Sequence, residues 1–384
     1  MIKVMGVEWK FALLCLFINS NSKTINLFNY FSVFIKTSNI HMQDNERIFS
    51  DFENVDKFKR EVLNPILPKA KFSSCFMQST PGVPADDFSG QLSPIHLLKG
   101  SVYEYKGDNS FIHYSSLFGL KAILESGFLR MSEFGNIMDK KELNFASIIF
   151  EDNNSLFRID EDTITVLKEN IFCLSLCESN EETKRNDFMW EVYGDKGKGA
   201  IIELKLTKKD PEFFIQGKVL YGNEKLNSIR EIKNLTEKFA AENNNFIPNN
   251  FAEFLIELQA FHKSKRYSIE NEVRFLMKEN KQQYDEHKLE TIYRDINSNQ
   301  EVKYFNKLFL KGRHPYLNSD QTKNNRKVLD EFPQVEIKRV ILGFNISIEN
   351  KVDIYTLLNK IKVQHNYDFE ISQINDDKEI FPMR

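Results

Sequence analysis

Two glutamates separated by one residue, Glu270 and Glu272, are the side chains here with the clearest chemical potential. The run Lys265 to Met277 predicts a strand, and alternation along a strand would place Ser268, Glu270, Glu272 and Arg274 on one face. Two carboxylates on one face supply a charge for a developing cation and an acceptor for a hydroxyl, with Arg274 holding the nearer one. The alternative is an exposed strand of alternating charge, which contributes little energy.

His113 is the second candidate. The segment Phe111 to Tyr114 predicts a short strand that turns Phe111 and His113 to one face and Ile112 and Tyr114 to the other. A neutral imidazole both donates and accepts, so His113 suits a ribose hydroxyl or a phosphate. The alternative is a structural histidine with satisfied hydrogen bonds.

Trp190 and Tyr193 form the third candidate, three residues apart on a predicted short helix. Two aromatic rings on one helical face could wall a pocket for a flat ring, or they could simply pack in the core. The glycines that follow, Gly194, Gly197 and Gly199, precede a strand rather than a helix. They therefore do not match the phosphate loop of a dinucleotide-binding fold.

Several enzyme classes lack their signatures in this chain. The sequence has no Ser-His-Asp order, metal-binding histidine pair or Walker-type loop. The net charge of −3 is not the basic excess typical of sequence-independent phosphate binding. A Mg²⁺-dependent nuclease or hydrolase would need further acids beside the glutamate pair, and Asp139, Glu142 and Asp187 are the ones available.

The predicted elements favour an α+β fold with a mixed, mainly antiparallel sheet and flanking helices. Ser116 is a plausible N-cap for a helix that ends at Gly127, after the Phe111 strand and before another strand. We expect the strands Asn170 to Leu176 and Gly199 to Leu206 to pair or to lie near each other. Three more elements are predicted: a helix from Asn250 to Phe261, a strand from Val340 to Leu342 and a helix from Ser347 to Ile361.

The chain divides by composition into four predicted parts. Residues 1–41 are a poorly structured apolar extension, either an over-extended start or a loose arm, and 42–107 are a helical segment with a linker or surface loop from Ser73 to Pro94. Residues 108–345 are the main domain, and 346–384 are a C-terminal helix and strand packed on it. The apolar run Phe11 to Ile18 has no cleavage site after it and is too short to span a bilayer. With four cysteines read as reduced thiols, we expect a cytoplasmic protein without membrane contact.

Four segments together resemble the bacterial family called domain of unknown function 2971. They are Phe-Ile-His-Tyr through Glu-Ser-Gly (111–127), Phe-Met-Trp-Glu-Val-Tyr-Gly through Gly-Lys-Gly (188–199), Tyr-Ser-Ile-Glu-Asn-Glu-Val-Arg (267–274) and Val-Ile-Leu-Gly (340–343). Their order and spacing match the family over about 235 residues. The family's Asn-Asp-Pro-x-Glu turn has only a loose counterpart here, between Phe134 and Glu142.

The same order of elements also resembles the ADP-ribosyltransferase fold, by analogy of pattern. That resemblance implies that His113 holds the cofactor ribose, that Tyr193 with Trp190 sandwiches nicotinamide, and that Glu272 or Glu270 stabilises an oxocarbenium-like transition state. Tyr114 and Arg274 complete the implied NAD-binding set. It implies an NAD-cleaving enzyme without a metal, passing ADP-ribose to a protein, a nucleic acid or water, as a toxin or an anti-phage effector. The alternative is a regulatory domain that binds a nucleotide or a partner without turnover.

Overall fold

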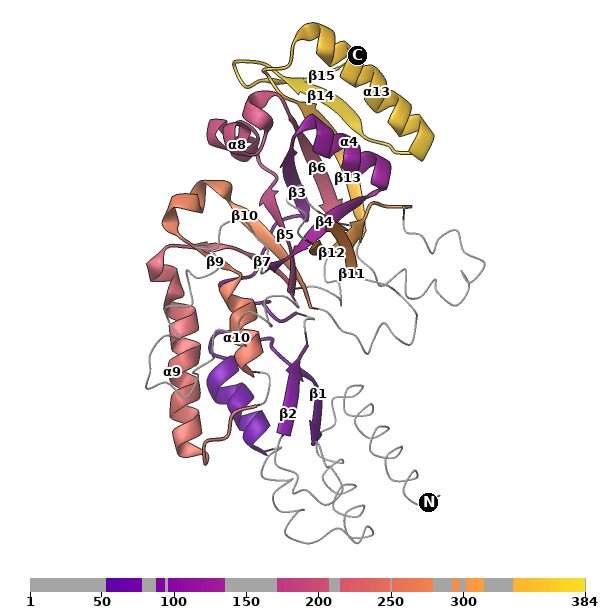
Figure 1. Ribbon diagram of the computed structural model, residues 1–384. Coiled ribbons are helices and arrows are strands. Elements are labelled where there is room, and N and C mark those ends of the chain that lie inside the picture. The colour runs from indigo at the N-terminus through magenta and orange to yellow at the C-terminus, as the bar shows by residue number, and fades with distance from the viewer. Residues whose placement is uncertain are drawn as a thin grey trace, which may run out of the picture. The chain divides into compact units, whose positions relative to one another are not determined.

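The computed structural model describes nine stretches of the chain: residues 53–77, 88–93, 96–134, 171–206, 215–248, 251–278, 292–296, 302–313 and 334–383. The predictions for residues 1–41, and for Asn250 as a helix cap, lie outside these stretches. The described chain divides into two compact units, coloured by residue number in Figure 1. The first holds residues of Met1–Ser101 and Ser228–Leu255, and the second holds residues of Val102–Asn153, Arg158–Asn227 and Ile256–Arg384.

The first unit is built from helices and a two-stranded antiparallel sheet. Its elements are η1 (Lys59–Leu63), β1 (Phe72–Met77), β2 (Phe88–Leu92), nearly all of α9 (Asn227–Glu242) and the start of α10 (Phe251–Gln259). Phe58, in the predicted helical segment, packs edge to face on Phe239 and Phe251, with ring centroids 5.2 and 4.9 Å apart. Apolar residues spaced three or four apart in this segment are all buried: Val55, Phe58, Val62 and Ile66.

Two predictions for this unit differ from the structure. The stretch Ser73 to Pro94 was expected to be a linker or a surface loop, but β1 and β2 pair there. Its Pro, Gly and Asp residues concentrate between the two strands, and composition alone does not reveal a pairing partner. Ser228–Leu255, expected in the main domain, groups with the first unit instead.

The second unit contains one 11-stranded sheet, so the fold is α+β with a mixed, mostly antiparallel sheet, as predicted. Along the main path the strand order is β11-β12-β4-β5-β3-β6-β13-β14-β15, while β10 pairs with β5 and β7. The bounds are β3 (Ser110–Ser115), β4 (Phe128–Glu133), β5 (Ile171–Glu178), β6 (Ala200–Leu206), β7 (Ile215–Lys218), β10 (Glu272–Lys278), β11 (Ile292–Ile296), β12 (Val302–Phe309), β13 (Val335–Leu342), β14 (Glu370–Ile374) and β15 (Ile380–Pro382).

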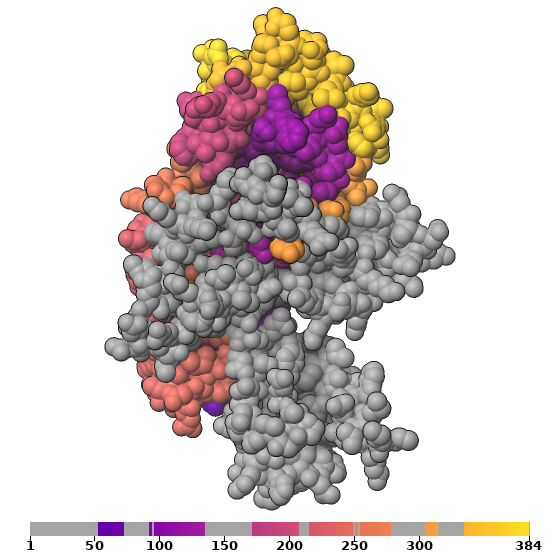
Figure 2. Space-filling view, viewed as in Figure 1, coloured from indigo at the N-terminus to yellow at the C-terminus, as the bar shows by residue number. Residues whose placement is uncertain are grey.

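The helices of this unit, with two short strands, connect and cover the sheet (Figure 1). They are α4 (Leu117–Ser126), α7 (Glu181–Lys184), α8 (Asp187–Val192), η4 (Asp195–Gly197), η5 (Asn223–Leu226), η6 (Lys265–Glu270) and α13 (Ile348–His365), with the parallel pair β8 (Leu220–Tyr221) and β9 (His262–Lys263). Figure 2 shows α4, in purple, beside the yellow α13 on the visible surface. In the part of the chain that the structure describes, no helix has the length and apolar character needed to cross a membrane.

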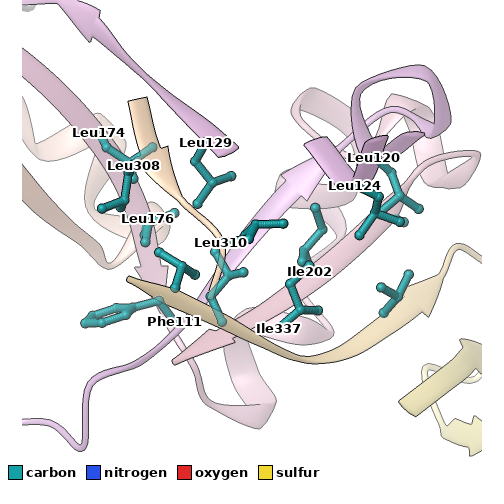
Figure 3. Packing of buried hydrophobic residues seen from close by; sticks show 14 of the residues in the cluster. Phe111, Leu120, Leu124, Leu129, Leu174, Leu176, Ile202, Leu308, Leu310 and Ile337 are labelled. Carbon is teal, nitrogen blue, oxygen red and sulfur yellow. The ribbon is translucent and has the colours of Figure 1, made fainter. Parts of the chain in front are cut away.

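Local sequence signals set the segment from β3 to β4. Ser116 caps α4 by accepting a hydrogen bond from the Gly119 amide, and Gly127 ends the helix at φ 79°, in the left-handed region that suits glycine. Leu120 and Leu124 on α4 are buried against the sheet, beside Ile202 and Ile337 (Figure 3). The predicted neighbours β5 and β6 do not pair, because β3 lies between them.

Cross-strand pairing shows which side chains share a face of the sheet. Ile112 on β3 pairs with Cys177 on β5, and Cys177 pairs in turn with Glu272 on β10. On its other side Ile112 pairs with Glu203 on β6. Directly paired residues point to the same side, so these four residues form a row on one face, called the Glu272 face below.

Candidate functional site

Lys263 lies at the centre of a buried cluster of four charged residues. Its Nζ is 2.7 Å from Oε2 of Glu270 and 2.6 Å from Oε2 of Glu272. Arg274 Nε donates to Oε1 of Glu272 at 2.7 Å. None of these four residues, called the carboxylate cluster below, is more than 5% exposed. Two carboxylates meet two cations, so the buried charge is compensated.

Glu272 is the most tightly held member of the carboxylate cluster. Burial raises its pKa, but Arg274 and Lys263 together outweigh burial and lower the pKa to about 2. Its main-chain amide donates to the hydroxyl of Tyr221 at 2.9 Å. Glu272 is therefore a fixed negative charge at neutral pH, and Arg274 holds it as the sequence predicted.

Glu270 reaches the cluster by a different route from the predicted one. The sequence placed Glu270 on one strand with Glu272, but Glu270 ends the 3-10 helix η6 and β10 begins only at Glu272. Asn271 between them adopts the left-handed conformation, with φ 43°. Asparagine tolerates this region better than most residues, and this turn allows both carboxylates to meet Lys263. The prediction that Glu270 and Glu272 lie together is therefore confirmed, but a turn at Asn271 brings them together and not strand alternation.

Tyr193 connects Glu270 to the surface. It caps the C-terminal end of α8 and is 43% exposed. Its hydroxyl donates to Oε1 of Glu270 at 2.7 Å. The hydroxyl of the exposed Tyr193 is thus bonded to the buried carboxylate of Glu270.

Lys263 and Tyr221 were missed in the sequence. They are direct partners in the parallel β8–β9 pair, which brings both side chains to Glu272. Strands of two residues leave no detectable alternation, and the contacts join positions far apart in the chain. A lysine close before the glutamate pair was the only local signal available.

His113 does not join the carboxylate cluster. It pairs with Ile202 on β6 and is one residue from Ile112, so it points to the face opposite the Glu272 face. Ile202 belongs to the core that α4 covers. Burial lowers the pKa of His113 to about 4, so the imidazole is neutral at physiological pH. The expected convergence of His113 with Tyr193 and Glu272 is absent from this arrangement.

Trp190 and Tyr114 are packed rather than presented to a ligand. Trp190 is fully buried, and its Nε1 donates to the carbonyl oxygen of Lys184 at 2.8 Å. The Tyr114 ring meets the Trp190 ring edge to face at 5.3 Å, and its hydroxyl donates to the carbonyl of Thr183. The Trp190–Tyr193 pair therefore does not form two walls of one pocket, because only Tyr193 is exposed.

The glycines after α8 serve close backbone packing. A Cβ on Gly199 would lie 2.2 Å from the carbonyl oxygen of Ser115, and a Cβ on Gly343 would lie 2.1 Å from that of Gly197. The amide of Gly343 donates to the carbonyl of Gly199 at 2.9 Å. Two of the four family-like segments, 188–199 and 340–343, thus touch through their main chains.

The acids considered for Mg²⁺ do not gather in the described part of the chain. Asp187 forms an ion pair with Lys378 at 2.7 Å, while Asp139 and Glu142 lie outside the described stretches. Among described residues, no three His, Cys, Asp or Glu side chains are arranged to hold a metal ion.

The arrangement leaves one carboxylate in contact with an exposed group. Glu272 has both oxygens engaged by cations, whereas Oε1 of Glu270 is bonded by the exposed Tyr193. A ligand hydroxyl that displaced the Tyr193 hydroxyl would meet a carboxylate whose other oxygen is paired with Lys263. Hydrogen bonds to ionised acceptors are stronger than those between neutral groups.

Comparison with known proteins relates part of the chain to a protein family. No curated protein matches the chain. No solved structure matches it either. Residues 189–275 match the family model described as "Protein of unknown function (DUF2971)", a range that begins before Tyr193 and ends just after Arg274. The segment that holds Tyr193, Lys263 and the two glutamates is therefore similar to the DUF2971 family.

Proposed function

We propose that this protein cleaves NAD, as an ADP-ribosyltransferase or an NAD glycohydrolase, with Glu270, Glu272 and Tyr193 at the reaction centre. The observation that carries the proposal is the 2.7 Å hydrogen bond from the exposed Tyr193 to the buried Glu270. It joins a flat aromatic surface to the carboxylate cluster. In the same proposal, the acceptor of ADP-ribose is a protein, a nucleic acid or water, and the protein acts as a toxin or an anti-phage effector.

Each residue has a separate role in this proposal. The Tyr193 ring provides the exposed surface on which nicotinamide stacks. Glu270 accepts a ribose hydroxyl and places negative charge where the ribose becomes positive as nicotinamide departs. Glu272, fixed by Arg274 and Lys263, adds a second preorganised charge. His113 has no role here, because it lies on the opposite face of the sheet.

The test is nicotinamide release from NAD by the purified protein. Glu270→Gln is expected to lower the rate on the order of a hundredfold, because the amide keeps the shape and removes the charge. Glu272→Gln is expected to lower it too, with a loss of stability.

Glu203→Gln is the matched control. Glu203 is also buried and ion-paired, with its Oε1 2.5 Å from Lys184 and its Oε2 2.5 Å from Arg339. It lies on the Glu272 face three strand spacings away, roughly 14 Å. Glu203→Gln should therefore lower stability and leave the rate of nicotinamide release unchanged. Equal rates for the parent and Glu270→Gln would show that Glu270 is not catalytic.

A second candidate is a domain that binds a nucleotide-like ligand without turnover. It is favoured by the full ion pairing of Glu272, which leaves that carboxylate no free oxygen for a substrate. Calorimetric titration with NAD separates the two functions. Saturable binding without nicotinamide release would support the second candidate.

A further inference from the structure

The hydroxyl of Tyr221 lies beside the carboxylate cluster. Its oxygen accepts the main-chain amide of Glu272 at 2.9 Å. The residue is half-buried, so part of it is accessible from solvent. Its strand partner Lys263 contacts both Glu270 and Glu272. Tyr221 therefore borders the same site as Tyr193, from another element.

The proton of this hydroxyl has no acceptor among the described residues. A phenol hydroxyl is both a donor and an acceptor, and here only the acceptor function is used. Burial raises the pKa of Tyr221, with Glu272 adding to the effect, so the hydroxyl keeps its proton at neutral pH. Buried polar groups ordinarily have hydrogen-bond partners, so a ligand is the expected acceptor for the Tyr221 hydroxyl proton.

We propose that the Tyr221 hydroxyl donates a hydrogen bond to the ligand bound at the carboxylate cluster. The inference rests on the proposed function and adds a residue to its binding site. The acceptor on the ligand is a neutral oxygen, a carbonyl or a hydroxyl. A neutral acceptor fits because Lys263 and Arg274 already pair with Glu270 and Glu272, so the cluster carries no unpaired charge that a charged ligand group would balance.

NAD offers two acceptors of this kind, the carboxamide oxygen of nicotinamide and the ribose hydroxyls. The main-chain amide of Glu272 holds the oxygen of the Tyr221 hydroxyl in place. The hydroxyl proton can then rotate only about this fixed oxygen, and it points away from the amide. A donor held in this way loses little freedom on binding, which favours affinity.

The first experiment compares Tyr221→Phe with the parent by calorimetric titration of NAD and of ADP-ribose. Phenylalanine keeps the ring and removes the hydroxyl. A lost hydrogen bond to a neutral acceptor is expected to weaken binding about fivefold. The variant should also be less stable, because the amide of Glu272 loses its acceptor.

Tyr367→Phe is the control for that loss of stability. Tyr367 is also half-buried, and its hydroxyl donates to the carbonyl of Leu124 at 2.9 Å, far along the chain from the cluster. It should lose stability without any change in affinity. An unchanged affinity of Tyr221→Phe for both ligands would overturn the inference.

A second measurement distinguishes donation to the ligand from a purely structural role. Difluorotyrosine at position 221 makes the hydroxyl a stronger donor and a weaker acceptor. Donation to the ligand predicts tighter binding together with lower stability. Unchanged or weaker binding with lower stability means that the hydroxyl only accepts the Glu272 amide, and overturns the inference.

The two proposals fail in different ways. If the parent binds neither NAD nor ADP-ribose, the proposed function fails and the role of Tyr221 fails with it. If the parent binds and Tyr221→Phe binds equally well, only the role of Tyr221 fails.

Discussion

Tyr221 and Lys263 are direct partners across the short β8–β9 pair, and both contact Glu272, the first at its main-chain amide and the second at its carboxylate. The β8–β9 pair thus holds Glu272, the first residue of β10, at both its main chain and its side chain. Asn271, in the left-handed conformation, then turns Glu270 back to the same lysine. Two residues that precede and follow Asn271 meet at one ammonium group.

Lys263→Met is predicted to destabilise the protein by about 3–5 kcal/mol, because it leaves two buried carboxylates with one cation fewer. Chemical denaturation would measure the loss. Lys121→Met is the control, since the Lys121–Glu125 pair is long, at 3.8 Å, and half exposed. That exposed pair should cost no more than about 0.5 kcal/mol. Similar losses for the two variants would show that the cluster is not desolvated.

Stability is predicted to fall on acidification through Glu272. Its pKa is about 2 in the folded protein against an ordinary value of 4.5, so its contribution is complete above pH 4.5 and is lost as the pH falls toward 2. Because Glu272→Gln lacks this titration, the difference in unfolding free energy between parent and variant should shrink over that interval. A difference that stays constant from pH 6 to pH 2 would contradict the strong pairing of Glu272.

His113→Gln is predicted to leave nicotinamide release at the parent's rate, since His113 and Glu272 lie on opposite faces of the sheet. The variant should be less stable, because His113 is half-buried. Rate measurement beside thermal unfolding checks both statements. A rate loss comparable to that of Glu270→Gln would restore the role that the fold resemblance implied for His113.

Gly343→Ala is predicted to destabilise the protein by about 3 kcal/mol or more, because the added Cβ would lie 2.1 Å from the carbonyl oxygen of Gly197. Gly312→Ala is the control: Gly312 has φ 79° but no atom within 4 Å of the added Cβ. Only the cost of the left-handed conformation, about 1 kcal/mol, applies there. Equal losses would mean that the Gly197–Gly343 approach relaxes freely.

Local signals predicted the elements better than their partners. Ser116 as a cap and Gly127 as the end of α4 depend only on neighbouring residues, and both were confirmed. The helix α9 was missed, although Ile229, Ile232, Thr236, Phe239 and Ala240 recur at helical spacing and are buried. The position of β3 between β5 and β6 depends on long-range pairing, which periodicity does not report.

The candidate site was predicted in part for the same reason. Glu270, Glu272 and Arg274 were identified by residue type, and they do meet. The left-handed Asn271 broke the expected strand, and the central cation came from β9, a two-residue strand. Alternation had already separated His113 from Ile112, but only the register across β3, β5 and β10 showed that Glu272 lies on the Ile112 side.

The most direct test of a ligand site at the carboxylate cluster is calorimetric titration of ADP-ribose into the parent, Glu270→Gln, Glu203→Gln and His113→Gln. We predict saturable binding by the parent, binding at least about tenfold weaker by Glu270→Gln, and parent-like affinity for the other two variants. Parent-like affinity for Glu270→Gln, or a loss confined to His113→Gln, would contradict a ligand site at the carboxylate cluster.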